Sequence, residues 1–326
     1  MLASQTLDPV FEASVRDHLD RVEVALLQAA DADSAMVREA AQHVILAGGK
    51  RFRPLLVVLG SHLGPAAVDA DVQRAAVVVE LTHVASLYHD DVMDEAGLRR
   101  GTMSPNARWG NTVAILVGDL LFARASDLVV DLGPEFVRLQ AQTFARLVQG
   151  QIAETVGPAA GQDRLDHYLQ VVADKTGSLI ATSALFGAKL AGASPAQQQV
   201  MAEFGEQIGV IFQLSDDIID ITSDETGKTP GTDLREGIPT LPTLLARASD
   251  DPADARLLTL LDSDLSSDHD LAEALDLLRR HRSIEQARAD VRRRAESARL
   301  LLEGLPDGPA RASLEELCDT VVSRTV

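Results

Sequence analysis

The chain has 326 residues, of which 46% are apolar and only 3% aromatic, and its formal net charge is −19. A chain of this length and apolar content can bury a large core, as one domain or two. The scarcity of aromatic residues disfavours sheet-rich folds and favours an all-helical protein. The acidic charge argues against a nucleic-acid partner, because phosphate backbones are bound through basic surfaces. An anionic small substrate would need local clusters of cations.

The cysteine content and the absence of long apolar segments indicate where the protein works. The single cysteine, Cys318, excludes an internal disulfide and a cysteine-based zinc site, which fits a reducing cytoplasm. The N-terminal segment MLASQTLDPVFEASVRDHLD lacks the apolar core of a secretory signal peptide. No segment reaches the ~18 uninterrupted apolar residues of a membrane span. We therefore expect a soluble, cytoplasmic protein with no transmembrane segment.

The first third of the chain has the hydrophobic periodicity of helices. An amphipathic helix is predicted over about residues 9–47, closed by the Gly48–Gly49 pair at the usual glycine stop position. A second helix is predicted after Pro54. A helix at about 72–94 carries apolar residues on more than one face, which is typical of a buried central helix.

The rest of the chain continues the helical pattern after an expected loop at 97–110. Further helices are predicted at 112–131, 134–156, 164–191 and 195–222, followed by a loop and by acidic helices with a basic run at 292–294. No Ser/Gly-rich linker and no internal repeat interrupts the pattern. We therefore expect residues 1–326 to form a single all-helical domain.

Two aspartate-rich segments of the form DDxxD lie near the ends of two of these helices. They comprise Asp90, Asp91 and Asp94, and Asp216, Asp217 and Asp220. Because residues advance ~100° each along a helix, each motif places its carboxylates on one wall. The simplest alternative is a solvated acidic surface, but both motifs directly follow apolar runs, so the carboxylates should lie at the mouth of a buried interior. Clustered carboxylates at such a place need a cation, and oxygen ligands suit Mg²⁺.

Lysines and arginines cluster beside the same elements. They are Lys50, Arg51 and Arg53 in the segment GGKRFRP, Arg99 and Arg100 after the first motif, Lys175, and Lys228 after the second motif. Arg binds phosphate oxygens bidentately and Lys acts as a point charge, so this set could hold two diphosphates in an otherwise repelling protein. The Gly48–Gly49 pair alone is a weak phosphate-loop signal, because a helix end explains it equally well.

The order of these segments resembles that of the trans-polyprenyl diphosphate synthases of the long-chain type. The matching blocks are GGKRFRP, HDDVMDEAGLRRG, NARWGN, VGDLLFARA, DKTGSL, and FQLSDDIID followed by TGKTPGTDLREGIPTLP, all between residues 48 and 242. The ending LEGLPDGPARASLEEL also resembles that of the family. Two DDxxD motifs with GGKRxRP make a highly specific combination. The resemblance implies an all-α, single-domain bundle of antiparallel helices around a deep central cavity, as in isoprenoid synthases, usually as a homodimer.

The resemblance also implies a role for each candidate residue. Magnesium would be bound by Asp90, Asp91, Asp94, Asp216 and Asp217, with about three ions per active site bridging the allylic diphosphate and Asp220 more peripheral. The allylic diphosphate would be held by Arg99, Lys175, Thr176, Gln213 and Lys228. Isopentenyl diphosphate would be held by Lys50, Arg53, His83 and Arg100. Taken alone, His83 reads as an ordinary buried histidine, but its place seven residues before Asp90 favours a functional role.

These residue types suffice for chain elongation. Breaking the allylic C–O bond leaves a carbocation and a diphosphate, whose charge magnesium, Arg and Lys would stabilise while a dry apolar cavity excludes water. Isopentenyl diphosphate attacks through its double bond, and the released diphosphate can accept the final proton, so no Ser-His-Asp or Cys-His group is required. One departure is Ile238, where many relatives have Lys. We expect it to weaken or redistribute allylic diphosphate binding without abolishing activity.

Product length should depend on the helix positions one and two turns before Asp90, which are Ser86, Ala85 and Thr82. A helical turn is ~5.4 Å, roughly one extended isoprene unit. Short-chain relatives often carry aromatic residues at the positions of Ala85 and Ser86, and both are small here. We therefore expect a long product of about C30 to C50 for quinone side chains, with about C15 to C25 as the alternative. Tyr88 lies ~200° from Asp90 around the helix and is expected to pack in the core.

Two other functions compete with chain elongation. A class I terpene cyclase shares the aspartate-rich magnesium site, but it needs no second diphosphate site, so GGKRFRP and the second motif argue against it. A regulatory subunit of a heteromeric synthase would be expected to lack some of the aspartates or Arg99 and Arg100, and this chain keeps all of them. The expected partners are isopentenyl diphosphate, an allylic diphosphate and a second copy of the chain, with transient membrane contact on product release.

Overall fold

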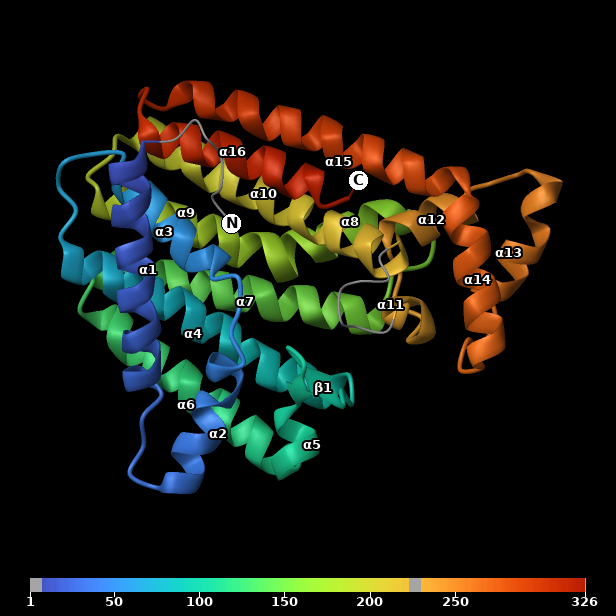
Figure 1. Cartoon of the computed structure of the whole chain (residues 1–326), viewed down its shortest axis with the longest axis horizontal. Coiled ribbons are helices and arrows are strands. Elements are labelled where there is room, and N and C mark those ends of the chain that lie inside the picture. The colour runs from blue at the N-terminus through green and yellow to red at the C-terminus, as the bar shows by residue number, and fades with distance from the viewer. Residues whose placement is uncertain (1–7, 223–229, 326) are drawn as a thin grey trace. The chain divides into compact units, whose positions relative to one another are not determined.

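The computed structural model describes residues 8–222 and 230–325, and these residues are almost entirely helical, which confirms the all-α prediction (Figure 1). The first six helices are α1 (Pro9–Ala29), α2 (Ala35–Leu46), α3 (Phe52–Ser61), α4 (Asp69–Met93), α5 (Pro105–Trp109) and α6 (Asn111–Val130). They are followed by α7 (Pro134–Val156), α8 (Arg164–Val172), a π-helical segment (Ala173–Gly177), α9 (Ser178–Leu190) and α10 (Pro195–Thr222). No helix of the described residues is long and apolar enough to cross a membrane.

The last part of the chain contains both short and long helices. They are α11 (Thr232–Arg235), α12 (Leu241–Arg247), a 3₁₀ turn (Pro252–Asp254), α13 (Ala255–Leu261), α14 (Asp268–Arg280), α15 (Arg282–Leu301), a 3₁₀ turn (Leu302–Gly304) and α16 (Pro309–Ser323). The strands of the described chain, β1 (Leu98–Arg99) and β2 (Thr102–Met103), form one antiparallel pair.

Three predicted elements differ from the structure in ways that local chemistry explains. The helix expected at 9–47 is broken between α1 and α2, where the Asp31 side chain accepts a hydrogen bond from the Ala32 backbone at 2.9 Å. Such side-chain bonds compete with helix formation. The helix expected at 164–191 is interrupted by the π-helical segment, and the loop expected at 97–110 contains β1, β2 and α5.

The described residues form two compact units. Unit 1 takes them from Met1–Arg146, Ser178–Gly205 and Leu302–Glu316, and unit 2 takes them from Leu147–Gly177, Glu206–Leu301 and Leu317–Val326. The first aspartate motif therefore belongs to unit 1 and the second to unit 2. The expectation of a single domain over residues 1–326 stays a prediction.

Helix α4 is the central helix of unit 1 and packs against α1, α3, α6 and α9. Its apolar side chains point in several directions and are fully buried at Val78, Leu81 and Val84, as expected of a helix surrounded by others. Gly118 of α6 lies so close to α4 that an added Cβ would collide with the ring of His89. This glycine allows α6 to approach the helix that carries the first aspartate motif.

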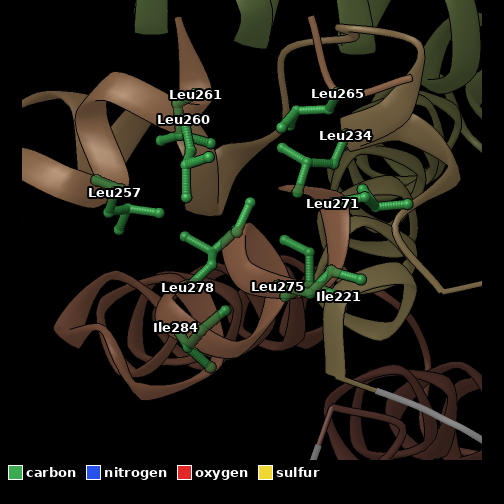
Figure 2. Close-up of a cluster of buried hydrophobic side chains, with 12 residues drawn as sticks. Ile221, Leu234, Leu257, Leu260, Leu261, Leu265, Leu271, Leu275, Leu278 and Ile284 are labelled. Carbon is green, nitrogen blue, oxygen red and sulfur yellow. The ribbon is translucent and has the colours of Figure 1, made fainter. Parts of the chain in front are cut away.

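The core of unit 2 is formed by leucines and isoleucines from α10 to α15 (Figure 2). Its buried members are Ile221, Leu234, Ala246, Leu257, Leu260, Leu261, Leu265, Leu271, Ala274, Leu275, Leu278 and Ile284. Each fully buried Leu or Ile side chain stabilises the folded state by about 1.5–3 kcal/mol, compared with the same side chain left exposed to water. Gly231 has φ 75°, and an added Cβ would lie 2.9 Å from Leu275 Cδ2, so this turn after the second motif requires glycine.

Candidate active site

The first aspartate motif occupies the last turn of α4. The Asp94 backbone N–H donates to the Asp90 carbonyl at 2.8 Å and ends the helix there. Asp91 is fully buried, and its Oδ1 accepts a 2.6 Å hydrogen bond from Arg99 Nε, whereas Asp90 is half-buried and Asp94 exposed. Burial raises the pKa of Asp91, which Arg99 opposes and Asp94 reinforces. The three carboxylates of the motif therefore have different environments.

A tight hairpin brings Arg99 and Arg100 to this motif. Strands β1 and β2 are joined through Arg100 and Gly101, both with positive φ (52° and 78°), as in a type I′ turn. A non-glycine residue in this conformation costs roughly 1–2 kcal/mol. The Arg100 side chain offsets that cost, since its Nη1 donates to the Val44 carbonyl at 3.0 Å and also to the Gly48 carbonyl. The hairpin thus holds Arg99 against Asp91 and Arg100 against the end of α2.

The GGKRFRP segment lies beside the same hairpin. Lys50 is exposed, while an added Cβ on Gly49 would lie 2.8 Å from Arg51 Nη1 and 2.9 Å from Arg100 Nη1. Gly49 therefore leaves room for the guanidinium groups of Arg51 and Arg100 beside the backbone, a role that the sequence does not reveal. Arg53 is partly buried, and its Nε has no hydrogen-bond partner among the described residues.

His83 lies among these arginines on α4. Burial lowers the pKa of His83 well below its usual value, and the charges of Arg53, Arg100, Arg99 and Arg51 lower it further. Burial also lowers the pKa of Arg53 to about 10. The imidazole is therefore neutral at physiological pH and can exchange hydrogen bonds with a ligand in this cationic environment without adding charge.

The predicted chain-length residues are all buried on α4. Thr82 is 1% exposed, Ala85 0% and Ser86 9%. The Thr82 hydroxyl donates to the Val78 carbonyl at 2.8 Å and accepts a long hydrogen bond of 3.4 Å from Gln140 Nε2 of α7. Tyr88 is fully buried and donates to a backbone carbonyl of α2, so it packs in the core as expected.

The second aspartate motif lies in the last two turns of α10, in unit 2. Asp217 is 2% exposed and accepts hydrogen bonds from the Tyr168 hydroxyl, from the Leu241 backbone N–H at 3.1 Å and from Gln213 Nε2 at 3.2 Å. Burial, with a smaller contribution from the charge of Asp216, raises the pKa of Asp217 to about 6, although the hydrogen bonds lower it. Asp217 is thus held in a fixed orientation by three elements of one unit.

The other two aspartates of this motif face different groups. Asp216 Oδ1 accepts a hydrogen bond from Arg324, whose guanidinium lies 4.7 Å from the ring centroid of Phe212. The Asp220 carboxylate accepts from the Asp233 backbone N–H at 3.3 Å, and its carbonyl accepts from the Gly231 N–H at 2.9 Å. Asp220 therefore helps to fix the start of α11, and its more peripheral role in binding stays a prediction.

The predicted allylic-diphosphate residues Lys175, Thr176 and Gln213 lie in unit 2. Lys175 and Thr176 belong to the π-helical segment, a feature that is frequent at functional sites. Lys175 Nζ forms a 2.6 Å ion pair with Glu154, and the Thr176 hydroxyl donates to Gln213 Oε1 at 3.4 Å. Gln213 therefore links Thr176 to the second motif through its hydrogen bond with Asp217. Lys228 lies outside the described residues.

Ile238, the departure from the family pattern, follows α11. Its backbone N–H donates to the Asp233 carbonyl at 2.8 Å, and its side chain is half-buried. The backbone at this position is therefore tied to the same residue that contacts Asp220. An apolar side chain here supplies packing and no charge, so the cations expected near the second motif are those of the other candidate positions.

Both motifs have the properties expected of carboxylates that bind a divalent cation. Asp91 Oδ2 is buried with no hydrogen-bond partner in the described part of the chain, and the pKa values of Asp91 and Asp217 are raised chiefly by burial. A bound cation would remove that penalty. Elsewhere, His269, Asp270 and Glu273 form the one group of three ligands, among the described residues, with ligand atoms within 4.8 Å of one another. It fits a metal poorly, because Glu273 already forms an ion pair with Arg256.

Four residues near these motifs were missed as site residues by the sequence interpretation or given no role of their own. Arg51 and Glu80 form a buried ion pair in unit 1, and Tyr168 and Arg324 contact Asp217 and Asp216 in unit 2. Tyr168 and Arg324 lie far along the chain from their partners, and no spacing reveals them. A signal for Glu80 did exist, since a single charge inside the apolar run AAVVVELTHVASLY requires a buried partner.

Comparison with known proteins agrees with this geometry. Residues 34–278 match the polyprenyl synthetase family. Nonaprenyl diphosphate synthase of Mycobacterium tuberculosis is 48% identical over 320 residues, covering 97% of this chain and 95% of that protein. Octaprenyl diphosphate synthase of Escherichia coli is 30% identical over 321 residues, covering 98% and 99%. The crystal structure of geranylgeranyl pyrophosphate synthase from Corynebacterium glutamicum, complexed with calcium and isoprenyl diphosphate, has a TM-score of 0.87 and 43% identity, covering 98% of each chain. Extensive similarity in both sequence and structure, together with the two aspartate motifs, places this chain in the polyprenyl synthetase family.

Proposed function

We propose that this chain is a prenyltransferase that condenses an allylic diphosphate with isopentenyl diphosphate in successive steps to give a long trans-polyprenyl diphosphate. The observation that carries the proposal is that the chain has both buried carboxylates suited to a metal and a cluster of cations suited to a diphosphate. Each aspartate motif contains one fully buried carboxylate with a raised pKa, Asp91 or Asp217, and a separate group of arginines surrounds a neutral histidine. Long-chain synthases among the relatives support a product of about C30 to C50, which the small residues Ala85 and Ser86 also favour.

The residues around the first motif have distinct tasks in this proposal. Asp90, Asp91 and Asp94 would hold Mg²⁺, and bound cations would neutralise the charge of the diphosphate leaving group. Asp91 Oδ1 also orients Arg99, because it contacts both Nε and Nη2 of the guanidinium, and Nη1 would then bind a phosphate oxygen. Lys50, Arg53, His83 and Arg100 would bind isopentenyl diphosphate. Neutral His83 can donate one hydrogen bond to a phosphate oxygen in this arrangement.

The residues around the second motif have tasks of their own in this proposal. Asp216 and Asp217 would hold Mg²⁺, of which about three ions per site are expected, with Asp220 more peripheral. Lys175, Thr176, Gln213 and Lys228 would bind the allylic diphosphate and stabilise its charge as the C–O bond breaks. The hydrogen bond from Gln213 to Asp217 supports this grouping, because it joins a substrate residue to a metal residue.

Elongation assays test the proposed reaction. Purified protein is incubated with isopentenyl diphosphate, Mg²⁺ and, separately, dimethylallyl, geranyl, farnesyl or geranylgeranyl diphosphate, and the product lengths are measured by mass spectrometry. We expect long products with at least one primer. The absence of elongation with every primer would refute the proposal. Cyclic hydrocarbon products would instead favour a terpene cyclase.

We further propose that the enzyme is a cytoplasmic homodimer that contacts membranes only to release its product. Helix α6 supports the dimer, because Ile115 is 42% exposed and Leu116 61% exposed on adjacent positions of one helix. An exposed apolar pair of this kind is more stable when covered by a partner surface. Light scattering after gel filtration should give twice the monomer mass, and Leu116→Glu should shift the protein toward the monomer. A monomeric wild-type protein would contradict this part of the proposal.

A further inference from the structure

Glu80 is a buried carboxylate to which neither the metal sites nor the substrate contacts proposed above assign a role. It lies on α4, ten residues before Asp90, and is 2% exposed. Its Oε1 accepts a 2.9 Å hydrogen bond from Arg51 Nη1. A buried charge of this kind is stable only when opposite charges compensate it, and the identity of those charges indicates what it does.

Arg51 is the direct partner of Glu80 and is itself 7% exposed. Its Nη2 donates to Glu23 Oε2 at 2.9 Å and to the Ile45 carbonyl at 3.0 Å. The backbone of Arg51 has φ 49°, a left-handed conformation that costs a non-glycine residue roughly 1–2 kcal/mol. The side-chain contacts offset that cost. Since Arg51 lies between Lys50 and Arg53, holding Arg51 fixes the backbone from which both proposed substrate cations extend.

Glu80 also acts on two arginines beyond Arg51. Burial lowers the pKa values of Arg53 and Arg100. For each arginine, the charge of Glu80 opposes this lowering more than any other group does. Glu23 differs from Glu80, because its side chain is 42% exposed and its charge raises the pKa of Arg100 less than the charge of Glu80 does. One buried carboxylate thus compensates three guanidinium groups that would otherwise repel one another around His83.

We propose that Glu80 is a positioning residue for isopentenyl diphosphate, which holds Arg51 in its strained conformation and keeps Arg53 and Arg100 close together so that both can face one diphosphate. This inference rests on the proposed function. Glu80 need not touch the substrate for this role. It holds the cationic side chains in place before the ligand binds, so that these side chains lose less conformational entropy on binding.

Glu80→Gln tests the proposal, because it keeps the shape of the side chain and removes its charge. Isothermal titration with isopentenyl diphosphate in the absence of metal should show affinity at least tenfold weaker than wild type. In steady-state assays, KM for isopentenyl diphosphate should rise about tenfold, while KM for the allylic substrate and kcat change less than about threefold. Glu23→Gln removes the other carboxylate of Arg51 and should weaken binding less than about threefold.

The outcomes separate this inference from the proposed function. If wild-type protein neither binds isopentenyl diphosphate nor elongates a primer, the proposed function fails. If wild type does both and Glu80→Gln binds equally well or more tightly, Glu80 merely opposes the ligand and only the positioning role is overturned. Glu80→Asp keeps the charge but withdraws the carboxylate from Arg51, and it should also raise KM for isopentenyl diphosphate more than KM for the allylic substrate, which makes it the decisive variant if Glu80→Gln does not fold.

Discussion

Replacing Ala85 with Phe should shorten the product. Ala85 is fully buried on α4, five residues before Asp90. At ~1.5 Å per residue it lies ~7.5 Å below the first motif, between one and two isoprene units of roughly 5.4 Å each. Adding bulk to a packed interior costs about 1–3 kcal/mol, and every ~1.4 kcal/mol changes a ratio tenfold. Yields of products that must pass this position should therefore fall roughly five- to hundredfold.

The measurement is the distribution of product lengths with the preferred primer, determined by mass spectrometry beside wild type. We expect the main product to be shorter than that of wild type by at least about one isoprene unit. Ala41→Phe makes the same change at a fully buried alanine of α2, off α4, and should leave the length distribution unchanged even if it lowers stability. An active Ala85→Phe enzyme with wild-type product lengths would refute the reasoning, and Ser86→Phe would then show whether the limit lies on this helix at all.

Three further predictions concern the metal and the two motifs. Chelation by EDTA should abolish elongation and excess Mg²⁺ should restore it, whereas activity that persists in EDTA would contradict a metal-dependent reaction. Tyr168→Phe removes a hydrogen bond to buried Asp217 and should lower the free energy of unfolding by about 1–3 kcal/mol in denaturant titration; a change below the measurement error would mean that this contact is weak. Because the pKa of His83 is lowered by burial and four arginines, its ring should stay neutral by NMR above about pH 6.5. Its contribution to stability is then complete above that pH and falls as the pH drops below it, and His83→Gln should remove that slope.

The sequence predicts well where the two aspartate motifs lie on their helices, because that signal is local. Asp90 and Asp216 each follow an apolar run within one helix, so their place near a helix end follows from neighbouring residues alone. The different environments of Asp90 and Asp91 could not be predicted, because Asp91 is buried by contact with Arg99, which the hairpin supplies. The difference between Asp90 and Asp91 depends on a turn with two positive φ angles, and the sequence predicts only a loop for that segment.

Contacts between distant segments account for most of what the sequence leaves open. Tyr168 and Asp217 are 49 positions apart, and Arg324 and Asp216 are 108 apart. Neither pair has a periodicity that links its members. The break between α1 and α2 was missed for a different reason: the apolar pattern continues across it, and only the turn chemistry of Asp31 interrupts the helix.

The π-helical segment at Ala173–Gly177 makes this part of unit 2 more sensitive to the deletion of one residue than to a substitution. A π-helical turn accommodates one residue more than an α-helical turn does. Deleting a single residue would turn this segment into ordinary α-helix and would change the directions in which its side chains point. Thr176 could then no longer reach Gln213, although both residues would still be present. The spacing between Tyr168 and Lys175 is therefore as much a part of this site as the identities of the two residues.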